Sequence, residues 1–344
     1  MRELYLFLHL IIYNNMSKYL VIGSNSFSGS HFVNYLINKK QKIIGVSRSK
    51  EINSIFLPYK WGDNKKKFKF HQININKQLN LLLKLVKKFK PDYIINFAAQ
   101  GMVAQSWISP EDWYQTNLLG QVKLHNELRK INSIKKYIHI TTPEVYGSTN
   151  KWIKENFKFQ PSTPYAVSRA ACDLHLMSFY KNYNFPVIFT RAANVFGPGQ
   201  QLYRIIPKAM ISARIGKKIN LHGGGHSKRS FIYIEDVCDA IYRIIQRGII
   251  GETYHISTNK IISIRKLVET ICLMTSINFS DLVKISNERR GKDHAYLLNT
   301  SKLRKKLRWR DQTSLEEGLK KTLNWVDKKL NYLKKISAEY KHKV

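Results

Sequence analysis

The chain has 344 residues, of which 43% are hydrophobic, so it can bury a large core in one large domain or two modest ones. Its 58 lysines and arginines outnumber its 23 acidic residues, but the excess is dispersed lysine without a basic arm, so we expect no specific nucleic-acid partner. No apolar run approaches the roughly 20 residues that span a bilayer, so we expect a soluble protein without a membrane partner.

Three cysteines, Cys172, Cys238 and Cys272, lie far apart in the chain and show no metal-ligand spacing. They cannot all pair within one chain, which fits a reducing compartment. We therefore expect buried free thiols in a cytoplasmic protein, and no metal site.

Residues 1–15 precede the first predicted strand. They hold a short apolar run, but they lack the basic start and the small-residue cleavage site of a signal peptide. Met16 leads at once into that strand. We therefore expect Met16 to be the true start and residues 1–15 to be a leader outside the fold.

A buried strand is predicted at 18–22, and a glycine turn follows it directly, ahead of a helical apolar pattern. This order directs backbone N–H groups and the positive end of a helix at a diphosphate. The spacing is Gly-x-x-Ser-x-x-Gly, so Ser26 stands where the three-glycine fingerprint has its second glycine. The residues expected to bind a dinucleotide here are Gly23, Asn25, Ser26, Phe27, Ser28 and Gly29.

The second predicted strand, 42–46, is followed by Ser47 and Arg48, which we also expect to bind the cofactor. An NAD-specific site places an acidic ribose ligand at this point, whereas Arg48 could bind the 2′-phosphate of NADP. An exposed arginine of a basic protein explains Arg48 about as well. The predicted cofactor is therefore NAD(P), with a slight preference for NADP.

Two further strands are predicted at 93–97 and 137–141, with a helical stretch between them. Alternating strands and helices indicate an α/β fold with a Rossmann-type doubly wound parallel sheet, whose chemistry lies at the carboxyl ends of the strands. Small residues after the first of these strands would let a cofactor approach the backbone. The candidate residues beyond the two strands are Ala98, Ala99, Gln100, Asn117, Thr142 and Glu144.

A helix is predicted from about residue 164 to residue 180, and it places Tyr165 and Arg169 four residues apart on one face. A nearby positive charge favours phenolate over phenol and so lowers the pKa of a tyrosine, which suits an acid or base near neutral pH. On these two residues alone, an accidental surface pair is the better explanation.

Taken in this order, the glycine turn, Thr142, Glu144, Tyr165 and Arg169 resemble the extended short-chain dehydrogenase/reductase family, in its branch of nucleotide-sugar dehydratases and epimerases. The resemblance covers residue 18 to about residue 325. It implies that Tyr165 and Arg169 also bind the dinucleotide, that the substrate is a nucleotide-diphosphate hexose and that the protein is a homodimer. The domains we expect are a Rossmann domain of 16–196 and 231–257, a smaller C-terminal α/β substrate domain of 197–230 and 258–335, and a tail of 336–344.

The same resemblance implies which residues hold the substrate. Segments 191–198, 223–229 and 288–293 are similar to the parts of the family that contact the sugar and the diphosphate. The residues expected to bind the nucleotide sugar are Asn194, Arg204, Arg229 and Arg289.

Glu144 separates the possible reactions. Oxidation of a sugar at C4 makes the C5 hydrogen acidic, and a positioned carboxylate can remove it as hydroxide leaves C6. We therefore expect a nucleotide-hexose 4,6-dehydratase whose catalytic residues are Thr142, Glu144, Tyr165 and Arg169.

Two departures from the family pattern keep alternatives open. Pro143 stands where glucose-type dehydratases carry an aspartate, and Arg169 replaces the family's lysine. Arginine keeps the charge, but its planar head is no simple substitute for an ammonium. A 4-epimerase, a UDP-glucuronate decarboxylase and a non-catalytic nucleotide- or RNA-binding member of the fold are the alternatives.

Overall fold

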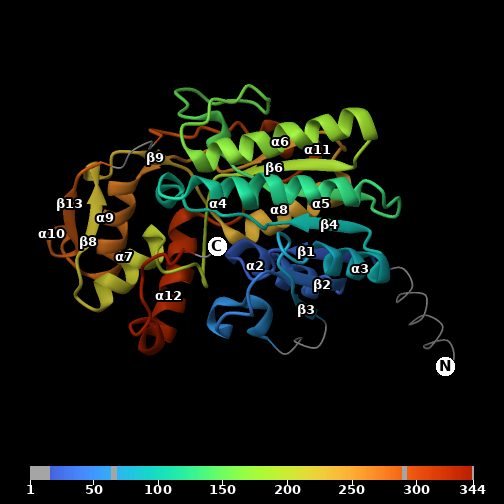
Figure 1. Ribbon diagram of the computed structural model, residues 1–344. Coiled ribbons are helices and arrows are strands. Elements are labelled where there is room, and N and C mark those ends of the chain that lie inside the picture. The colour runs from blue at the N-terminus through green and yellow to red at the C-terminus, as the bar shows by residue number, and fades with distance from the viewer. Residues whose placement is uncertain (1–15, 63–67, 289–292, 343–344) are drawn as a thin grey trace.

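The computed structural model describes residues 16–62, 68–288 and 293–342. Within these residues a seven-stranded sheet is covered by helices on both faces (Figure 1). All of its neighbouring strands run parallel. In spatial order they are β11 (Thr253–Ile256), β6 (Val187–Ala192), β5 (Lys136–Thr141), β4 (Tyr93–Asn96), β1 (Lys18–Ile22), β2 (Lys42–Ser47) and β3 (Phe68–Gln72). This order reverses between β1 and β4, as in dinucleotide-binding sheets, and confirms the predicted Rossmann-type fold.

Both faces of the sheet are buried because alternate side chains of each strand point to opposite sides. In β1, Tyr19 and Val21 pack into the core on the side of α2 and α8, whereas Leu20 and Ile22 pack on the side of α3, α5 and α6. A strand buried on both faces is a continuous apolar run, which is why residues 18–22 were predictable. The helices on the sheet are α2 (Phe27–Asn38), α3 (Leu79–Phe89), α4 (Pro110–Tyr114), α5 (Gly120–Leu128), α6 (Pro164–Tyr183) and α8 (Ile234–Arg247).

A second, smaller region lies beyond the carboxyl ends of the strands, at the left of Figure 1. Its elements are α7 (Ile205–Arg214), β8 (Ile219–His222), α9 (Ile264–Thr275), α10 (Phe279–Leu282), β13 (Val283–Ser286) and α12 (Leu315–Leu333). The two-stranded pairs that link it to the sheet region are β7 (Asn194–Phe196) with β10 (Phe231–Tyr233), and β9 (Lys228–Arg229) with β12 (Ile262–Ser263). The proposed domain limits stay a prediction. In sequence, α11 (Ser301–Leu307) lies within the predicted substrate domain, between β13 and α12, but it packs on β11 and α8.

Local signals set the ends of α6, the helix that carries Tyr165. Thr163 caps it, because its Oγ1 accepts a hydrogen bond from the Ala166 N–H at 3.1 Å, and Pro164 occupies the first turn. The helix ends at Asn184, whose φ of 52° lies in the left-handed region. The catalytic candidate is therefore held in the first turn of a long, firmly capped helix.

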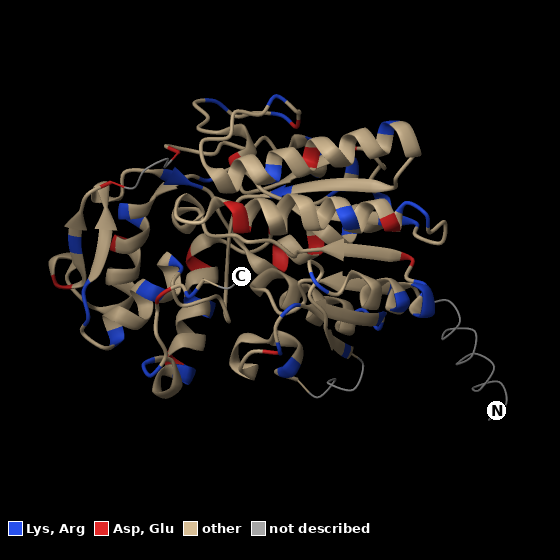
Figure 2. Cartoon of the chain, viewed as in Figure 1, with Lys and Arg blue, Asp and Glu red and all other residues tan. Residues whose placement is uncertain are grey.

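The three cysteines are free and buried, as predicted. No helix in the described ranges is long and apolar enough to cross a bilayer. Lysines and arginines are spread over many elements of both regions rather than gathered on one (Figure 2). Residues 1–15, for which a leader was predicted, lie outside the described residues.

Candidate active site

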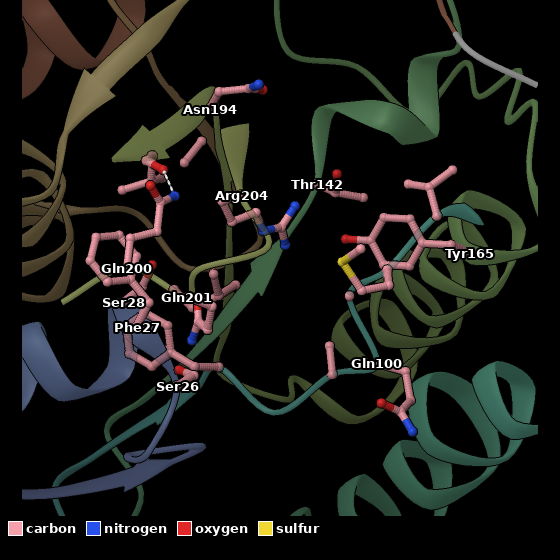
Figure 3. A pocket seen from close by; sticks show the side chains of 18 of the residues that line it. Ser26, Phe27, Ser28, Gln100, Thr142, Tyr165, Asn194, Gln200, Gln201 and Arg204 are labelled. Atoms are coloured by element: carbon pink, nitrogen blue, oxygen red, sulfur yellow. Dashed lines mark hydrogen bonds between the residues drawn. The ribbon is translucent and has the colours of Figure 1, made fainter. Parts of the chain in front are cut away.

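A cavity of about 960 Å³ lies at the carboxyl ends of the parallel strands, between the sheet and the smaller region. This volume is near the upper end of the roughly 300–1,000 Å³ that ligand pockets occupy. Figure 3 shows several of its side chains. The predicted site residues that line it are Gly23, Asn25, Ser26, Phe27, Ser28, Ser47, Arg48, Ala98, Ala99, Gln100, Thr142, Glu144, Tyr165, Arg169, Asn194, Arg204 and Arg229.

Two predicted cofactor residues support this wall rather than form it. Asn117 accepts a hydrogen bond from the Gln100 N–H at 2.8 Å, and its amide donates to the Gln100 carbonyl and to Ser168 Oγ. Gly29 packs directly against the Gly23 carbonyl, which leaves no room for a side chain. Arg289, a predicted substrate residue, lies outside the described residues.

The glycine turn has the geometry of a diphosphate cradle. Gly23 has a φ of +84°, and a Cβ there would lie 2.7 Å from the Ala98 nitrogen, so only glycine fits. Ser26 caps α2, because its Oγ accepts a hydrogen bond from the Gly29 N–H at 3.0 Å. The first N–H groups of a helix have no partner within the helix and bind anions well. The turn therefore fits a dinucleotide, and its cap explains the serine at position 26.

The end of β2 supplies Ser47 and Arg48 to the same wall. Ser47 Oγ accepts a hydrogen bond from the Asn25 N–H at 3.0 Å, which ties the glycine turn to the neighbouring strand. Arg48 Nη2 donates to Gln100 Oε1 at 3.3 Å across the ends of two strands. A cation is therefore held at the edge of the cradle.

Glu144 follows β5 in a short 3₁₀ turn, Pro143–Tyr146, that Thr142 caps. Thr142 Oγ1 accepts from the Glu144 N–H at 3.3 Å, and Pro143 occupies the first position of the turn, where proline is favoured. Burial raises the pKa of Glu144 to about 7, against the lowering effect of Arg229. The carboxyl can therefore both take up and release a proton near neutral pH.

Tyr165 lies beside Thr142, with its hydroxyl directed toward Arg204 across the cavity (Figure 3). Burial and the charge of Glu144 raise the pKa of Tyr165, while Arg169 and a hydrogen bond with Thr142 lower it. The net effect raises the pKa of Tyr165, so the prediction that the Tyr165–Arg169 pair lowers it is wrong for the chain alone. Burial outweighs the single cation.

Arg169 points toward β5 and is only 2% exposed. Its Nη2 donates to the Ile140 carbonyl and lies 3.5 Å from His139 Nε2. One turn further along α6, the fully buried Asp173 lies 3.4 Å from His139 Nε2 and 2.9 Å from Arg191 Nη2. The cation predicted to serve Tyr165 is thus one member of a buried charge network.

Burial alone would raise the pKa of Asp173, but His139 and Arg191 hold it below its usual value. Asp173 was not predicted from the sequence. It lies four residues after Arg169 on the same helix, and this spacing, which favours an ion pair, was the available signal.

Arg229 lines the cavity, but its guanidinium is already engaged. It donates to the carbonyls of Lys228, His294 and Asp293 at 2.8–2.9 Å, and it stacks over the ring of Tyr296 at 4.4 Å. Its contact with a diphosphate stays a prediction, because in this structure Arg229 braces the loop at residues 293–296. Arg204 instead projects into the middle of the cavity (Figure 3).

The sequence profile of the GDP-mannose 4,6 dehydratase family matches residues 20–322. The chain belongs to this family. Among the described residues, no group of three or more histidine, cysteine, aspartate or glutamate side chains is placed to hold a metal ion.

Known relatives match most of the length of this family member. It is 31% identical to the dTDP-D-glucose 4,6-dehydratase of Homo sapiens, over 93% of this chain and 92% of that one. It is 29% identical to the dTDP-glucose 4,6-dehydratase of Haemophilus influenzae, over 90% and 98%. A trifunctional UDP-glucose 4,6-dehydratase of Arabidopsis thaliana is 32% identical over 89% of this chain, but the chain spans only 46% of that longer protein.

Solved structures agree with these relatives. The dTDP-glucose 4,6-dehydratase of Streptomyces venezuelae, which holds NAD, has a TM-score of 0.85 at 26% identity and covers 92% of this family member and 98% of itself. A Thermotoga maritima UDP-glucose 4-epimerase reaches a TM-score of 0.82 at 26% identity, over 91% and 99%, so the fold does not separate the two reactions. The family profile, relatives and structures together confirm the predicted family, fold and nucleotide-sugar 4,6-dehydratase activity.

The cavity wall of this dehydratase also contains residues that sequence analysis missed. Tyr296 lies three residues beyond Asp293, the last residue of the predicted segment 288–293, so the proximity of that segment was the available signal. Tyr203 precedes the predicted Arg204. Tyr340 and Lys341 come from the predicted tail, and no sequence motif indicates that they line the cavity.

Proposed function

We propose that this enzyme dehydrates a nucleoside-diphosphate hexose across C5 and C6, with Tyr165 and Glu144 as its proton-transfer groups. One observation carries the proposal: Glu144 is half-buried beside Tyr165, with a pKa raised by desolvation to about 7, in the cavity that also contains the glycine turn. An isolated carboxylate at a strand end would keep an ordinary pKa, and a binding protein has no use for this pair.

The residues divide the reaction between them. Tyr165, hydrogen-bonded to Thr142 and near Arg169, removes the proton of the C4 hydroxyl. When bound, NAD supplies the oxidation by accepting the hydride of C4 and returning it to C6. Glu144 removes the C5 proton and donates it to the hydroxide that leaves C6, so that water departs.

The atoms balance over these steps. C6 gains the hydride that C4 lost. C5 regains one proton, which balances the proton that Tyr165 took from the C4 hydroxyl. The product is a 4-keto-6-deoxy sugar plus one water. Because Glu144 can act as base and then as acid, an aspartate at position 143 is not required.

The cofactor and substrate are proposed at a finer level from the charges that surround the cavity. Arg48 stands at the edge of the cradle and supports a preference for NADP. Arg204 supports binding of the substrate diphosphate, and Asn194 supports binding of the sugar, because both line the cavity opposite Tyr165. The relatives are named for dTDP- and UDP-glucose, so these two nucleotides come first among the substrates to test.

A homodimer is proposed from exposed apolar side chains on neighbouring elements. They are Trp107 and Ile108 near α4, Leu119 before α5, and Val167 and Leu174 one heptad apart on α6, with exposed fractions of 38–80%. Exposed apolar patches of this kind mark protein interfaces. The face they form contains no residue assigned to the cavity.

Glu144→Gln tests the function. Without the base, formation of the dehydrated product should fall by about 10²–10⁴-fold, while nucleotide-sugar binding should change by less than about threefold because size and hydrogen-bonding groups are kept. Product is measured by mass spectrometry as the loss of one water from dTDP- or UDP-glucose. Glu111→Gln, an exposed acid on α4, is the control and should keep full activity.

Other outcomes would reassign the enzyme. Full activity in Glu144→Gln would contradict the proposal. An isomer of unchanged mass from the wild type would indicate a 4-epimerase, and loss of carbon dioxide from UDP-glucuronate would indicate the decarboxylase. Binding without turnover of any sugar would favour the non-catalytic alternative.

A further inference from the structure

The segment after α12 crosses the cavity instead of leaving the molecule. Tyr340 and Lys341 line the same cavity as Gly23, Glu144 and Tyr165. The last described residues accordingly lie near the middle of the molecule, between the sheet region and α7 (Figure 1). We call residues 337–342 the strap.

The strap follows α12 of the smaller region and ends on the sheet region. Where α12 ends, the Tyr332 hydroxyl accepts a hydrogen bond from Asn53 Nδ2 at 2.7 Å. At the other end the His342 ring stacks on Trp113 of α4, with centroids 5.0 Å apart, and its Nε2 lies 2.6 Å from the Asp112 carboxylate. The chain is therefore tied to the sheet region at the end of α12, before the strap, and again at His342, the last residue of the strap.

Between these anchors the strap meets the opposite wall. The Tyr340 ring packs edge-on against Tyr203 at 5.3 Å, next to Arg204. Burial raises the pKa of Tyr340, followed by the influence of Tyr203, while Arg48 and Arg204 lower it. Tyr340 thus lies within the electrostatic influence of both the arginine assigned to the cofactor and the arginine assigned to the substrate, and Lys341 adds a third cation to the lining of the same cavity.

We propose that Tyr340 and Lys341 are dinucleotide-binding residues and that the strap closes over the bound cofactor. The inference rests on the proposed function, and it adds a binding element from the smaller region to a site otherwise built on the sheet. The positive charge at the cavity supports this proposal. Three cations, Arg48, Arg204 and Lys341, line a cavity whose glycine turn fits a diphosphate.

The reaction gives this closure a purpose. The hydride taken from C4 has to return to C6 within the same turnover, so the reduced cofactor must not leave and water must stay out. A segment held by a ring stack on Trp113, a hydrogen bond with Asp112 and a ring contact with Tyr203 can also open, because few contacts need to break.

The test compares cofactor release from the full chain and from a chain that stops after Ile336, which keeps α12 intact. NAD release is followed by stopped-flow fluorescence, without any sugar substrate. We expect release from the shortened chain to be at least about tenfold faster, because it loses ionic and ring contacts to the dinucleotide. Melting of both chains without cofactor shows whether truncation damages the fold.

Point variants locate the effect within the strap. Tyr340→Ala and Lys341→Ala should each speed release, whereas Lys334→Ala, which removes another exposed lysine that lies outside the cavity, should not. Equal release from the full and shortened chains would overturn the inference. Slower release, or tighter sugar binding after truncation, would also overturn it, because the strap would then obstruct the site.

These outcomes separate the strap from the proposed activity. A full chain that holds NAD through the strap but forms no dehydrated product would overturn the proposed function alone. A full chain that binds no dinucleotide would overturn both. If the chain forms the dehydrated product but releases NAD at the same rate with and without the strap, only the present inference would be overturned.

Discussion

The wall of the cavity that the sheet supplies differs from the opposite wall in what holds its side chains. Gly23, Thr142 and Tyr165 stand at strand ends or in a capped first turn, where the parallel ladder and helix caps fix the backbone. Arg204, Tyr296 and Tyr340 come from a helix start, a loop and the strap. The sheet wall therefore sets the reaction geometry before a ligand arrives, whereas the opposite wall supplies charge and closure.

The two walls also differ in how their charges are balanced. On the sheet side, Arg169 belongs to a buried network with His139, Asp173 and Arg191. On the opposite side, Arg204, Arg229 and Asp293 act on Glu144 across the cavity, and burial raises the pKa of Glu144 despite the two arginines. The first arrangement stabilises a position, and the second tunes a proton affinity. Each difference can be tested separately.

The largest effect on stability is expected in the buried charge network behind the sheet wall. Asp173→Asn removes the charge that compensates Arg191, and both side chains are fully buried. An unpaired buried charge of this kind costs about 3–5 kcal/mol in the free energy of unfolding. Urea denaturation measures this loss of stability, provided that the slope of the unfolding free energy against urea concentration is the same for both proteins.

Asp327→Asn is the matched control, because Asp327 also pairs with an arginine, Arg214, but is 41% exposed. Its loss should cost no more than about 1 kcal/mol. If the two variants lost equal stability, the buried network would not be what holds the sheet wall, and the contrast between the walls would fail.

The same contrast explains how far the sequence could be interpreted. The sheet wall was predictable because each of its parts leaves a local pattern: an apolar run for β1, a glycine turn, and a capped helix before Tyr165. Ser26 looked like a defect in the fingerprint because its role as the cap of α2 is a contact that only the structure shows.

What the sequence could not reveal depends on contacts between distant segments. Arg229 is engaged by carbonyls about 65 residues away, so its motif alone overstated its freedom to bind a diphosphate. Tyr340 reaches the cavity because the chain turns back after α12, and its neighbours in sequence carry no pattern for that turn. Likewise, the pKa of Tyr165 depends on burial, which residue spacing does not report.

A smaller effect is expected from the carboxyl that the opposite wall tunes. The folded chain binds the Glu144 proton with a pKa of about 7, against an ordinary value of 4.5, so between these pH values it holds more protons than the unfolded chain. The unfolding free energy therefore falls as pH rises from 4.5 to 7, by up to about 3 kcal/mol from this group.

Glu144→Gln removes this titration and leaves the other groups in place. The variant should gain stability relative to the wild type across that pH range, by up to the same amount, and the gain should be absent near pH 4. Denaturation of both proteins at a series of pH values measures the difference. A difference that stays constant with pH would mean that Glu144 is not held in a desolvated site.

The smallest effect concerns the edge of the sheet wall. Arg48→Gln should weaken NADP binding by about tenfold, because a charge-assisted bond to the 2′-phosphate is lost, and should leave NAD binding within about twofold. Titration of both cofactors at one salt concentration measures this. Lys50→Gln, an exposed cation outside the cavity, is the control and should change neither. If Arg48→Gln weakened both cofactors equally, Arg48 would act with Tyr340 and Lys341 on the common diphosphate, and specificity for the cofactor would have to lie elsewhere than on the sheet wall.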